Sequence, residues 1–268
     1  MTTAAIRQEL PPRSVAVVTG ASSGIGAALA LALAAEGHAV ALASRSVDAL
    51  QRVAEAVRAA GGAALVVACD VRERSSVQHL VDTVVATWGR IDIAVANAGT
   101  YHRKPADEIA RADFEAAFAV NFWGSFHLIE AVLPRLLSQA SGHLVLVTSF
   151  DAKRAMPHDG AYAAAKSALA AYAGTLRQAV EGRGVHVCTV FPGRVDTKMV
   201  EDLEVPAISA KIPAARVASA VLRALRRRSP EVVVPWHCGL LLWADAISPR
   251  IGDWLVRTLH LDGRQRPY

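Results

Sequence analysis

The sequence predicts an α/β fold, in which seven parallel strands form one doubly wound sheet with helices on both faces. Short apolar runs rich in Val, Leu and Ala alternate along the chain with longer amphipathic segments. Strict alternation of strand and helix is typical of a parallel sheet wound by right-handed crossovers. The strand candidates are almost continuously apolar, as expected for strands buried on both faces. No linker-like segment divides the chain, so we expect a single domain.

The predicted strands are short apolar runs, and helical patterns lie between them. The strands are expected at residues 15–19, 39–43, 64–68, 91–96, 143–148, 185–190 and 231–234. The helices are expected near 24–37, 47–60, 74–88, 107–138, 160–182 and 213–228. This order predicts an N-terminal extension at 1–13, an α/β domain at 14–235 and a C-terminal segment at 236–268.

Composition excludes several classes of protein. The 268 residues are 53% hydrophobic and 20% charged, whereas disordered chains combine low hydrophobicity with high net charge. Cys69, Cys188 and Cys238 lie far apart, so the sequence predicts neither a disulfide framework nor a metal site, and we expect a reducing, cytoplasmic compartment. The net charge of +5 is scattered. The one dense run, Arg226 to Arg228, is expected at a helix C-terminus, so no nucleic-acid partner is predicted.

An uncharged stretch at residues 14–35 is long enough to span a bilayer. Turn-forming residues in its middle, TGASSGIG, would break a spanning helix. The preceding MTTAAIRQELPPRS lacks the charged-then-apolar build of a signal peptide. The sequence therefore predicts a soluble protein.

A glycine-rich turn, TGASSGIG at residues 19–26, follows the first predicted strand and precedes a helix. A phosphate-binding loop requires this context. Gly20 permits a tight turn, Gly24 lets the backbone approach a pyrophosphate, and Gly26 allows the helix to pack closely on the strand. The free N–H groups and the dipole at the helix start attract phosphate. The turn therefore predicts a dinucleotide site.

Further motifs follow in order: Asn97-Ala98-Gly99, then Ser149, then Tyr162-x-x-x-Lys166, then Pro192-Gly193. Together with TGASSGIG they resemble the short-chain dehydrogenase/reductase family, over residues 14 to about 235, in its compact single-domain branch. The resemblance implies a Rossmann fold and hydride transfer between a nicotinamide cofactor and a small-molecule carbonyl or secondary alcohol.

The resemblance implies a catalytic tetrad of Asn121, Ser149, Tyr162 and Lys166. Tyr162 and Lys166 are four residues apart and therefore neighbours on one helical face, and a nearby ammonium lowers the pKa of a phenol toward working pH. By resemblance, Tyr162 exchanges a proton with the substrate oxygen, Ser149 hydrogen-bonds that oxygen, and Lys166 holds the nicotinamide ribose. Asn121 would position a water that relays protons from Lys166. Thr148 is the less favoured candidate for the role of the serine.

The end of the second predicted strand favours NADP(H) over NAD(H). Enzymes that use NAD usually place an acidic residue there, whereas an Arg accommodates the 2′-phosphate of NADP. The sequence reads Ser44-Arg45-Ser46, with no acid nearby. The glycine loop carries Ser23 where many NADP-preferring relatives have a second basic residue.

The other cofactor contacts rest on the resemblance. Asp70 and Val71 would meet the adenine ring, although Asp70 could also cap the helix expected near Arg72. The predicted cofactor-binding residues are Gly20, Ser22, Ser23, Gly24, Ile25, Gly26, Ser44, Arg45, Asp70, Val71, Asn97, Ala98, Gly99, Tyr162, Lys166, Pro192, Gly193, Val195 and Thr197.

The substrate is expected beside Ser149 and Tyr162. The candidate apolar wall is Phe150, Met156, Phe191 and Val195, and the candidate polar contacts are Arg154, His158 and Arg194. His158 alternatively is a plain loop histidine. The sequence does not choose among sterol, acyl, sugar and xenobiotic carbonyls.

Several properties stay open between alternatives. The tail at 235–261 carries Trp236, Trp243 and Trp254 and could cover the substrate cleft, pack against a partner subunit or rest on a membrane interface. The resemblance implies a homodimer or homotetramer, built through the helices at 107–138 and 160–182.

The main rival function is a non-catalytic NADP-binding sensor or scaffold, because fold alone does not establish function. An epimerase or dehydratase of the longer branch is disfavoured by the glycine loop.

Overall fold

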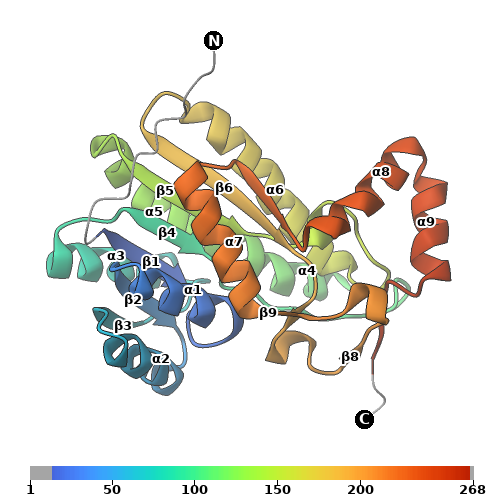
Figure 1. Cartoon of the computed structure of the whole chain (residues 1–268), viewed down its shortest axis with the longest axis horizontal. Coiled ribbons are helices and arrows are strands. Elements are labelled where there is room, and N and C mark those ends of the chain that lie inside the picture. The colour runs from blue at the N-terminus through green and yellow to red at the C-terminus, as the bar shows by residue number, and fades with distance from the viewer. Residues whose placement is uncertain (1–13, 266–268) are drawn as a thin grey trace.

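A seven-stranded parallel sheet forms the middle layer of the computed structural model (Figure 1), which confirms the predicted fold class. The model describes residues 14–265, apart from the side chains of residues 208, 264 and 265. The strand order is β10-β6-β5-β4-β1-β2-β3. The strands are β1 (Val15–Thr19), β2 (Ala39–Ser44), β3 (Ala64–Ala68), β4 (Ile93–Ala96), β5 (Gly142–Val147), β6 (Val185–Pro192) and β10 (Glu231–Val234).

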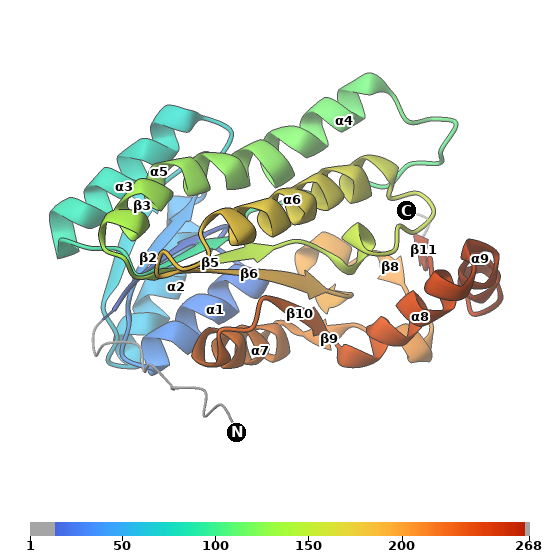
Figure 2. The same cartoon turned by 90° about the horizontal axis from the view of Figure 1, so that it is seen from above.

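Helices cover both faces of the sheet (Figure 2). One layer contains α1 (Gly24–Ala35), α2 (Val47–Ala59) and α7 (Ala214–Arg227). The other contains α3 (Arg74–Trp88), α4 (Arg111–Phe118), α5 (Gly124–Ser138) and α6 (Gly160–Ala179). Side chains of β1 alternate between two cores: Ala16 and Val18 pack with the first layer, and Val15 and Val17 pack with the second. Burial on both faces explains why the strand is apolar throughout.

Two local expectations at the helices were wrong. The helix expected from residue 107 begins at Arg111, and a π-helical turn, Ala119–Trp123, joins α4 to α5. Asp70 is not a helix cap, because α3 begins at Arg74 with Glu73 as its N-cap. The arginine run lies where it was expected, since α7 ends at Arg227.

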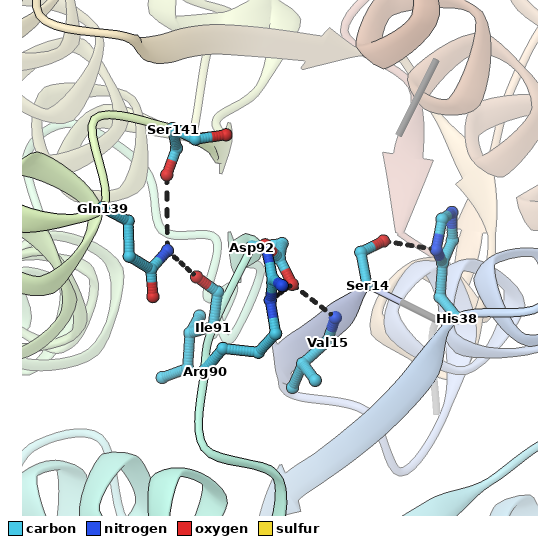
Figure 3. Close-up of polar contacts among 8 residues, drawn as sticks. All are labelled: Ser14, Val15, His38, Arg90, Ile91, Asp92, Gln139 and Ser141. Carbon is cyan, nitrogen blue, oxygen red and sulfur yellow. Dashed lines mark hydrogen bonds and ion pairs between the residues drawn. The ribbon is translucent and has the colours of Figure 1, made fainter. Parts of the chain in front are cut away.

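Polar contacts fasten the amino-terminal edge of the sheet (Figure 3). The buried Asp92 carboxylate accepts the backbone N–H of Val15 at 2.8 Å and the Arg90 guanidinium at 2.6 Å. Ser14 Oγ lies 2.5 Å from His38 Nδ1, at the entry to β2. The opposite edge, where the parallel strands end, is where ligands bind in doubly wound sheets.

The chain after β6 forms short strands and two helices beyond the edge of the sheet where the parallel strands end. Short strands pair there: β7 (Val195–Asp196) with β9 (Ile212–Pro213), and β8 (Leu203–Glu204) with β11 (Arg264–Gln265). After β10, a 3-10 turn leads into α8 (Gly239–Ile247) and α9 (Pro249–Thr258). Figure 2 shows these two helices beyond the arrowhead of β6.

One helical stretch in the described part of the chain, Arg111–Ser138, passes a length and hydropathy test for crossing a bilayer. Core helices of globular proteins pass the same test. Leu128, Ile129 and Val132 of this stretch are buried in the core beside the sheet, which accounts for its apolar composition.

Candidate active site

Two adjoining cavities lie along the carboxyl edge of the sheet. The first cavity, about 930 Å³, runs from the glycine-rich turn past Arg45 to Lys166. The second cavity, about 620 Å³, lies between Ser149 and the helices α8 and α9. Both cavities are lined by Ile25, Thr148, Tyr162, Thr197 and Met199. Tyr162 therefore stands at the junction of the two.

Most of the residues predicted to bind the cofactor line the first cavity. They are Gly20, Ser22, Ser23, Gly24, Ile25, Ser44, Arg45, Asp70, Val71, Asn97, Ala98, Gly99, Tyr162, Lys166 and Thr197. Pro192, Gly193 and Val195 line the second cavity. Gly26 lies behind the turn, where a Cβ atom would come within 2.3 Å of the Gly20 carbonyl oxygen.

The glycine-rich turn has the form of a phosphate cradle. Gly20 and Gly24 have φ values of +66° and +55°, which side chains other than glycine rarely adopt. The Asn97 side chain donates to the Thr19 carbonyl at 3.0 Å and so ties the turn to β4. The first turn of α1 contains no acidic residue, so nothing there opposes an anion at the positive end of the helix. These features fit a dinucleotide pyrophosphate.

Cations lie at the far end of the first cavity. Arg45 and Arg72 both line it, with Asp70 beside them. The Arg72 guanidinium holds the Asp70 carboxylate with a 2.5 Å contact, and this hydrogen bond lowers the pKa of Asp70. Among the residues that the structure describes, no carboxylate lies within ion-pair distance of Arg45. Sequence reasoning named Arg72 only as a helix start and missed it as a cavity residue.

Lys166 is a buried amine on α6. Only 3% of the residue is exposed, and burial lowers its pKa to about 8. Its Nζ donates to the Val147 carbonyl at 2.9 Å, at the end of β5. A Cβ atom on Gly99 would lie 3.6 Å from that Nζ, so glycine keeps the space around the amine open. The ammonium lies 6.0 Å from the centre of the Tyr162 ring.

Tyr162 is a buried phenol one turn before Lys166 on α6. Its ring meets the edge of the Tyr101 ring, with 4.9 Å between the centroids. Burial and the nearby Asp151 raise the pKa of Tyr162, contrary to the lowering expected from Lys166, while the hydrogen bond with Ser149 opposes the rise. At neutral pH the Tyr162 phenol is therefore protonated. In this state it can donate a proton to a substrate.

Asn121 lies in the π-helical turn and is completely buried. Its amide donates to the carbonyls of Thr100 and Ala117, both at 3.0 Å, and its Oδ1 accepts the Thr100 N–H at 3.2 Å. Asn121 therefore joins the helix to the loop after β4. A π-helical turn is rare and occurs frequently at functional sites.

Ser149 follows β5 and is paired with an acid that sequence reasoning did not identify. The Ser149 hydroxyl donates to Asp151 Oδ2 at 2.9 Å, and the Asp151 N–H donates back to Ser149 Oγ at 3.1 Å. Burial raises the pKa of Asp151 to about 7. The spacing of two residues in a turn was visible in the sequence, but the burial that makes this acid unusual was not.

Only some of the residues expected beside the substrate line the second cavity. Phe150, Met156, Val195 and Arg194 line the second cavity. Phe191 is buried beneath Lys153, whose amine lies 4.1 Å from the ring centre. Arg154 instead reaches the C-terminal helices, with its NH2 2.6 Å from Asp253. His158 is exposed and lines a separate small cavity, consistent with a plain loop histidine.

A buried ion pair beside Tyr162 was also missed. Arg103 and Asp159 meet at 2.8 Å with side chains only 4% and 3% exposed. The Tyr101 hydroxyl donates to the same Asp159 oxygen at 2.9 Å. The pair joins residues 56 positions apart, so periodicity in the sequence gives no signal for it. It holds the base of α6, and with it Tyr162, against the loop after β4.

Comparisons with known proteins agree with this geometry. A family model described as short chain dehydrogenase matches residues 14–206. Ketoacyl reductase HetN of Nostoc sp. is 33% identical over 250 residues, which cover 90% of this chain and 87% of that protein. The solved alcohol dehydrogenase of Thermococcus sibiricus, complexed with 5-hydroxy-NADP, is 32% identical with a TM-score of 0.76, over 83% of this chain and 96% of that one.

A third comparison adds a different cofactor. A 7 alpha-hydroxysteroid dehydrogenase, complexed with NADH and 7-oxo glycochenodeoxycholic acid, is 25% identical with a TM-score of 0.77. The likeness covers 82% of this chain and 91% of that one.

Proposed function

The chain belongs to the short-chain dehydrogenase/reductase family, and we propose that it is an NADP-dependent oxidoreductase acting on a carbonyl or secondary alcohol. The observation that carries the proposal is the position of Tyr162 at the junction of two cavities. One cavity has a phosphate cradle at its end, and the other is lined by Ser149. A proton donor between a cofactor site and a substrate site is what carbonyl reduction requires.

The charges at the far end of the first cavity support NADP(H) over NAD(H). Arg45 and Arg72 face the same space, and a 2′-phosphate could accept hydrogen bonds from both. Asp70, the acid that the described residues place at this end of the cavity, is paired with Arg72, and this pairing offsets its repulsion of a phosphate. Arg72, although paired with Asp70, places a second guanidinium beside Arg45, which the glycine loop does not provide. A charge-assisted hydrogen bond contributes about 1.5–3 kcal/mol.

The tetrad has a division of roles. When bound, the nicotinamide ring supplies the hydride to the carbonyl carbon or accepts it from the alcohol carbon. Tyr162 gives its proton to the carbonyl oxygen during reduction and takes it back during oxidation. Ser149 would turn its one hydroxyl proton from Asp151 to the same oxygen and so stabilise the charge that develops there. Lys166 favours the phenolate left on Tyr162, and Asn121 keeps the path from Lys166 toward solvent in place.

Two further properties are proposed on the same basis. The rival role, a non-catalytic NADP-binding sensor or scaffold, is disfavoured because the four residues of the tetrad line the two cavities. We also propose a homo-oligomer, since the exposed Trp123 lies just before α5, beside the half-buried Phe126 of α5 and Tyr172 of α6. We expect the protein in the cytoplasm.

The test of the catalytic role is an absorbance assay of NADPH oxidation against ketones, aldehydes and quinones. General acid catalysis contributes about 10²–10⁴ in rate, so Tyr162→Phe should lower kcat by at least about 100-fold. Tyr172→Phe makes the same change on the same helix, away from both cavities, and should leave kcat within twofold. Near-normal turnover by Tyr162→Phe, or no NADPH oxidation with any of these classes, would contradict the proposal.

The cofactor preference has its own test. Arg45→Ala should lower the ratio of kcat/KM for NADPH to that for NADH by about 10- to 100-fold, the equivalent of one charge-assisted hydrogen bond. Arg52→Ala, on the exposed side of α2, should leave the ratio unchanged. An unchanged ratio in Arg45→Ala would show that this guanidinium does not recognise the 2′-phosphate.

A further inference from the structure

The second cavity is a largely apolar chamber. Its volume of about 620 Å³ equals about 20 water molecules at about 30 Å³ each. Phe150 and Met156 line the side next to Ser149, and Leu203 lines the side formed by β8. Pockets of this size with few polar groups bind compounds through their apolar surface and orient them through those groups. Here the orienting groups are Ser149 and Tyr162.

The C-terminal helices complete the chamber with leucines. Leu241 of α8 and Leu255 of α9 line it, whereas Trp243 and Trp254 of the same helices are 74% and 57% exposed. The two helices thus turn one apolar face toward the cavity and another toward solvent. Leu261, beyond α9, lines the cavity as well.

We term α8, α9 and the residues up to 262 the cover. Three arginines bind the cover to the rest of the protein. Arg154 contacts Asp245 of α8 at 3.2 Å and Asp253 of α9 at 2.6 Å. Arg103 donates to the Asp262 carbonyl at 2.9 Å. Arg194 donates to the Leu261 carbonyl and, at 2.5 Å, to the Ser209 hydroxyl.

The same contacts disfavour a charged or sugar-like substrate. Arg103 is neutralised by Asp159, and Arg194 is engaged by two acceptors. Asp151 faces the cavity and in its ionised form repels anions. A polyhydroxylated compound would leave most of its hydroxyls against leucine and methionine side chains, and burying an unpaired hydroxyl is costly.

We propose that the second cavity selects a bulky, uncharged, apolar ketone or secondary alcohol, with its oxygen at Ser149 and Tyr162 and its hydrocarbon skeleton against leucines of α8 and α9. This substrate class rests on the proposed oxidoreductase function. The leucines that face the cavity are specificity-determining residues.

The test uses 2-butanone, 2-hexanone, 2-octanone and 2-decanone, with dihydroxyacetone as the polar probe. Two quantities are measured on the full chain: kcat/KM with NADPH, and Kd by calorimetry with and without NADP⁺. Each methylene buried in an apolar site is worth a factor of up to about four, so both quantities should improve at least twofold per added methylene. Dihydroxyacetone should be the poorest ligand.

Paired variants test whether the leucines of the cover cause the dependence of binding on ketone length. Leu255→Asn should weaken binding of 2-decanone about tenfold while changing 2-butanone less than twofold. Trp254→Asn, the neighbouring outward-facing residue, should leave both within twofold. Leu241→Asn on α8 repeats the test if Leu255→Asn does not fold.

The outcomes separate the two proposals. A Kd that falls along the ketone series, without any turnover, supports the apolar site and contradicts the oxidoreductase function. Turnover with a flat series, or with dihydroxyacetone preferred, overturns the apolar site and leaves the function standing. Failure of every ketone to bind overturns the apolar site as well. Equal loss in Leu255→Asn and Trp254→Asn would show that the leucines do not select the substrate.

Discussion

The buried amine of Lys166, to which we assign a role in the reaction, lowers the stability of the fold. Lys166 is almost completely enclosed, with one hydrogen bond to the Val147 carbonyl. Burial of a charged group without a partner acid is unfavourable, and the pKa of Lys166 falls from 10.5 to about 8 for that reason. At about 1.4 kcal/mol per pKa unit, the charged lysine costs the fold about 3 kcal/mol at pH 7.

We therefore expect Lys166→Met to abolish turnover and to stabilise the fold. The lost hydrogen bond to Val147 offsets about 1 kcal/mol, so the free energy of unfolding at pH 7 should rise by about 1–2 kcal/mol. Below pH 8 the lysine is protonated in both states and the full cost applies. Between pH 8 and 10.5 only the unfolded state keeps the proton, so wild-type stability rises with pH relative to the variant.

Urea unfolding of both proteins at pH 7 and pH 10 measures this difference. The advantage of the variant should be present at pH 7 and largely gone at pH 10. A variant less stable than wild type at pH 7, or an advantage that does not change with pH, would show that burial of the charge is not the dominant effect.

At the scale of elements, the C-terminal cover depends on a close approach of its two helices. A Cβ atom on Gly252 of α9 would lie 1.7 Å from Asp245 Oδ1 and 3.4 Å from Arg154 NH2. Glycine therefore leaves room for the acid that binds Arg154. A larger residue there displaces the carboxylate or the helix.

Gly252→Ala should loosen α8 and α9 while leaving the sheet intact. Overpacking costs about 1–3 kcal/mol, so amide hydrogen exchange across residues 239–258 should speed up by about tenfold or more, with exchange in β4 and β5 unchanged. Gly174→Ala is the control, because nothing lies within 4 Å of a Cβ atom at that position of α6. Unchanged exchange in α8 and α9 would mean that Asp245 does not hold the cover.

The elements also show how far the sequence can be interpreted. All seven strands of the main sheet were predicted, because strands buried on both faces are apolar without interruption, as β1 is. The tetrad residues were named because they occur in short local motifs. The π-helical turn around Asn121 was not predicted, since an amphipathic pattern does not distinguish it from an α-helix. The contacts of Arg103 with Asp159 and of Arg154 with Asp245 join distant positions, and no local pattern encodes such pairs.

For the whole molecule, exposed apolar side chains gather in two places. One is the outer side of the C-terminal helices. The other, which we term the aromatic face, lies in the layer of α3 to α6 and comprises the exposed Trp123 with the half-buried Phe118, Phe122, Phe126 and Tyr172. Its rings contact one another, and Trp123 at its edge is 49% exposed. Large exposed apolar patches mark interaction sites, and this patch lies where the end of α4, the π-helical turn and the start of α5 meet α6.

If the aromatic face joins two copies of the chain, Trp123→Glu should convert the oligomer to a smaller species, because a charge buried at an interface without a partner is unfavourable. Trp243→Glu, on the outer side of α8, should leave the mass unchanged. Light scattering after size-exclusion chromatography at micromolar protein measures both. The reverse result would place the subunit contact on the outer side of the C-terminal helices and so tie the cover of the second cavity to assembly. A monomeric wild-type protein would exclude either contact as a stable interface.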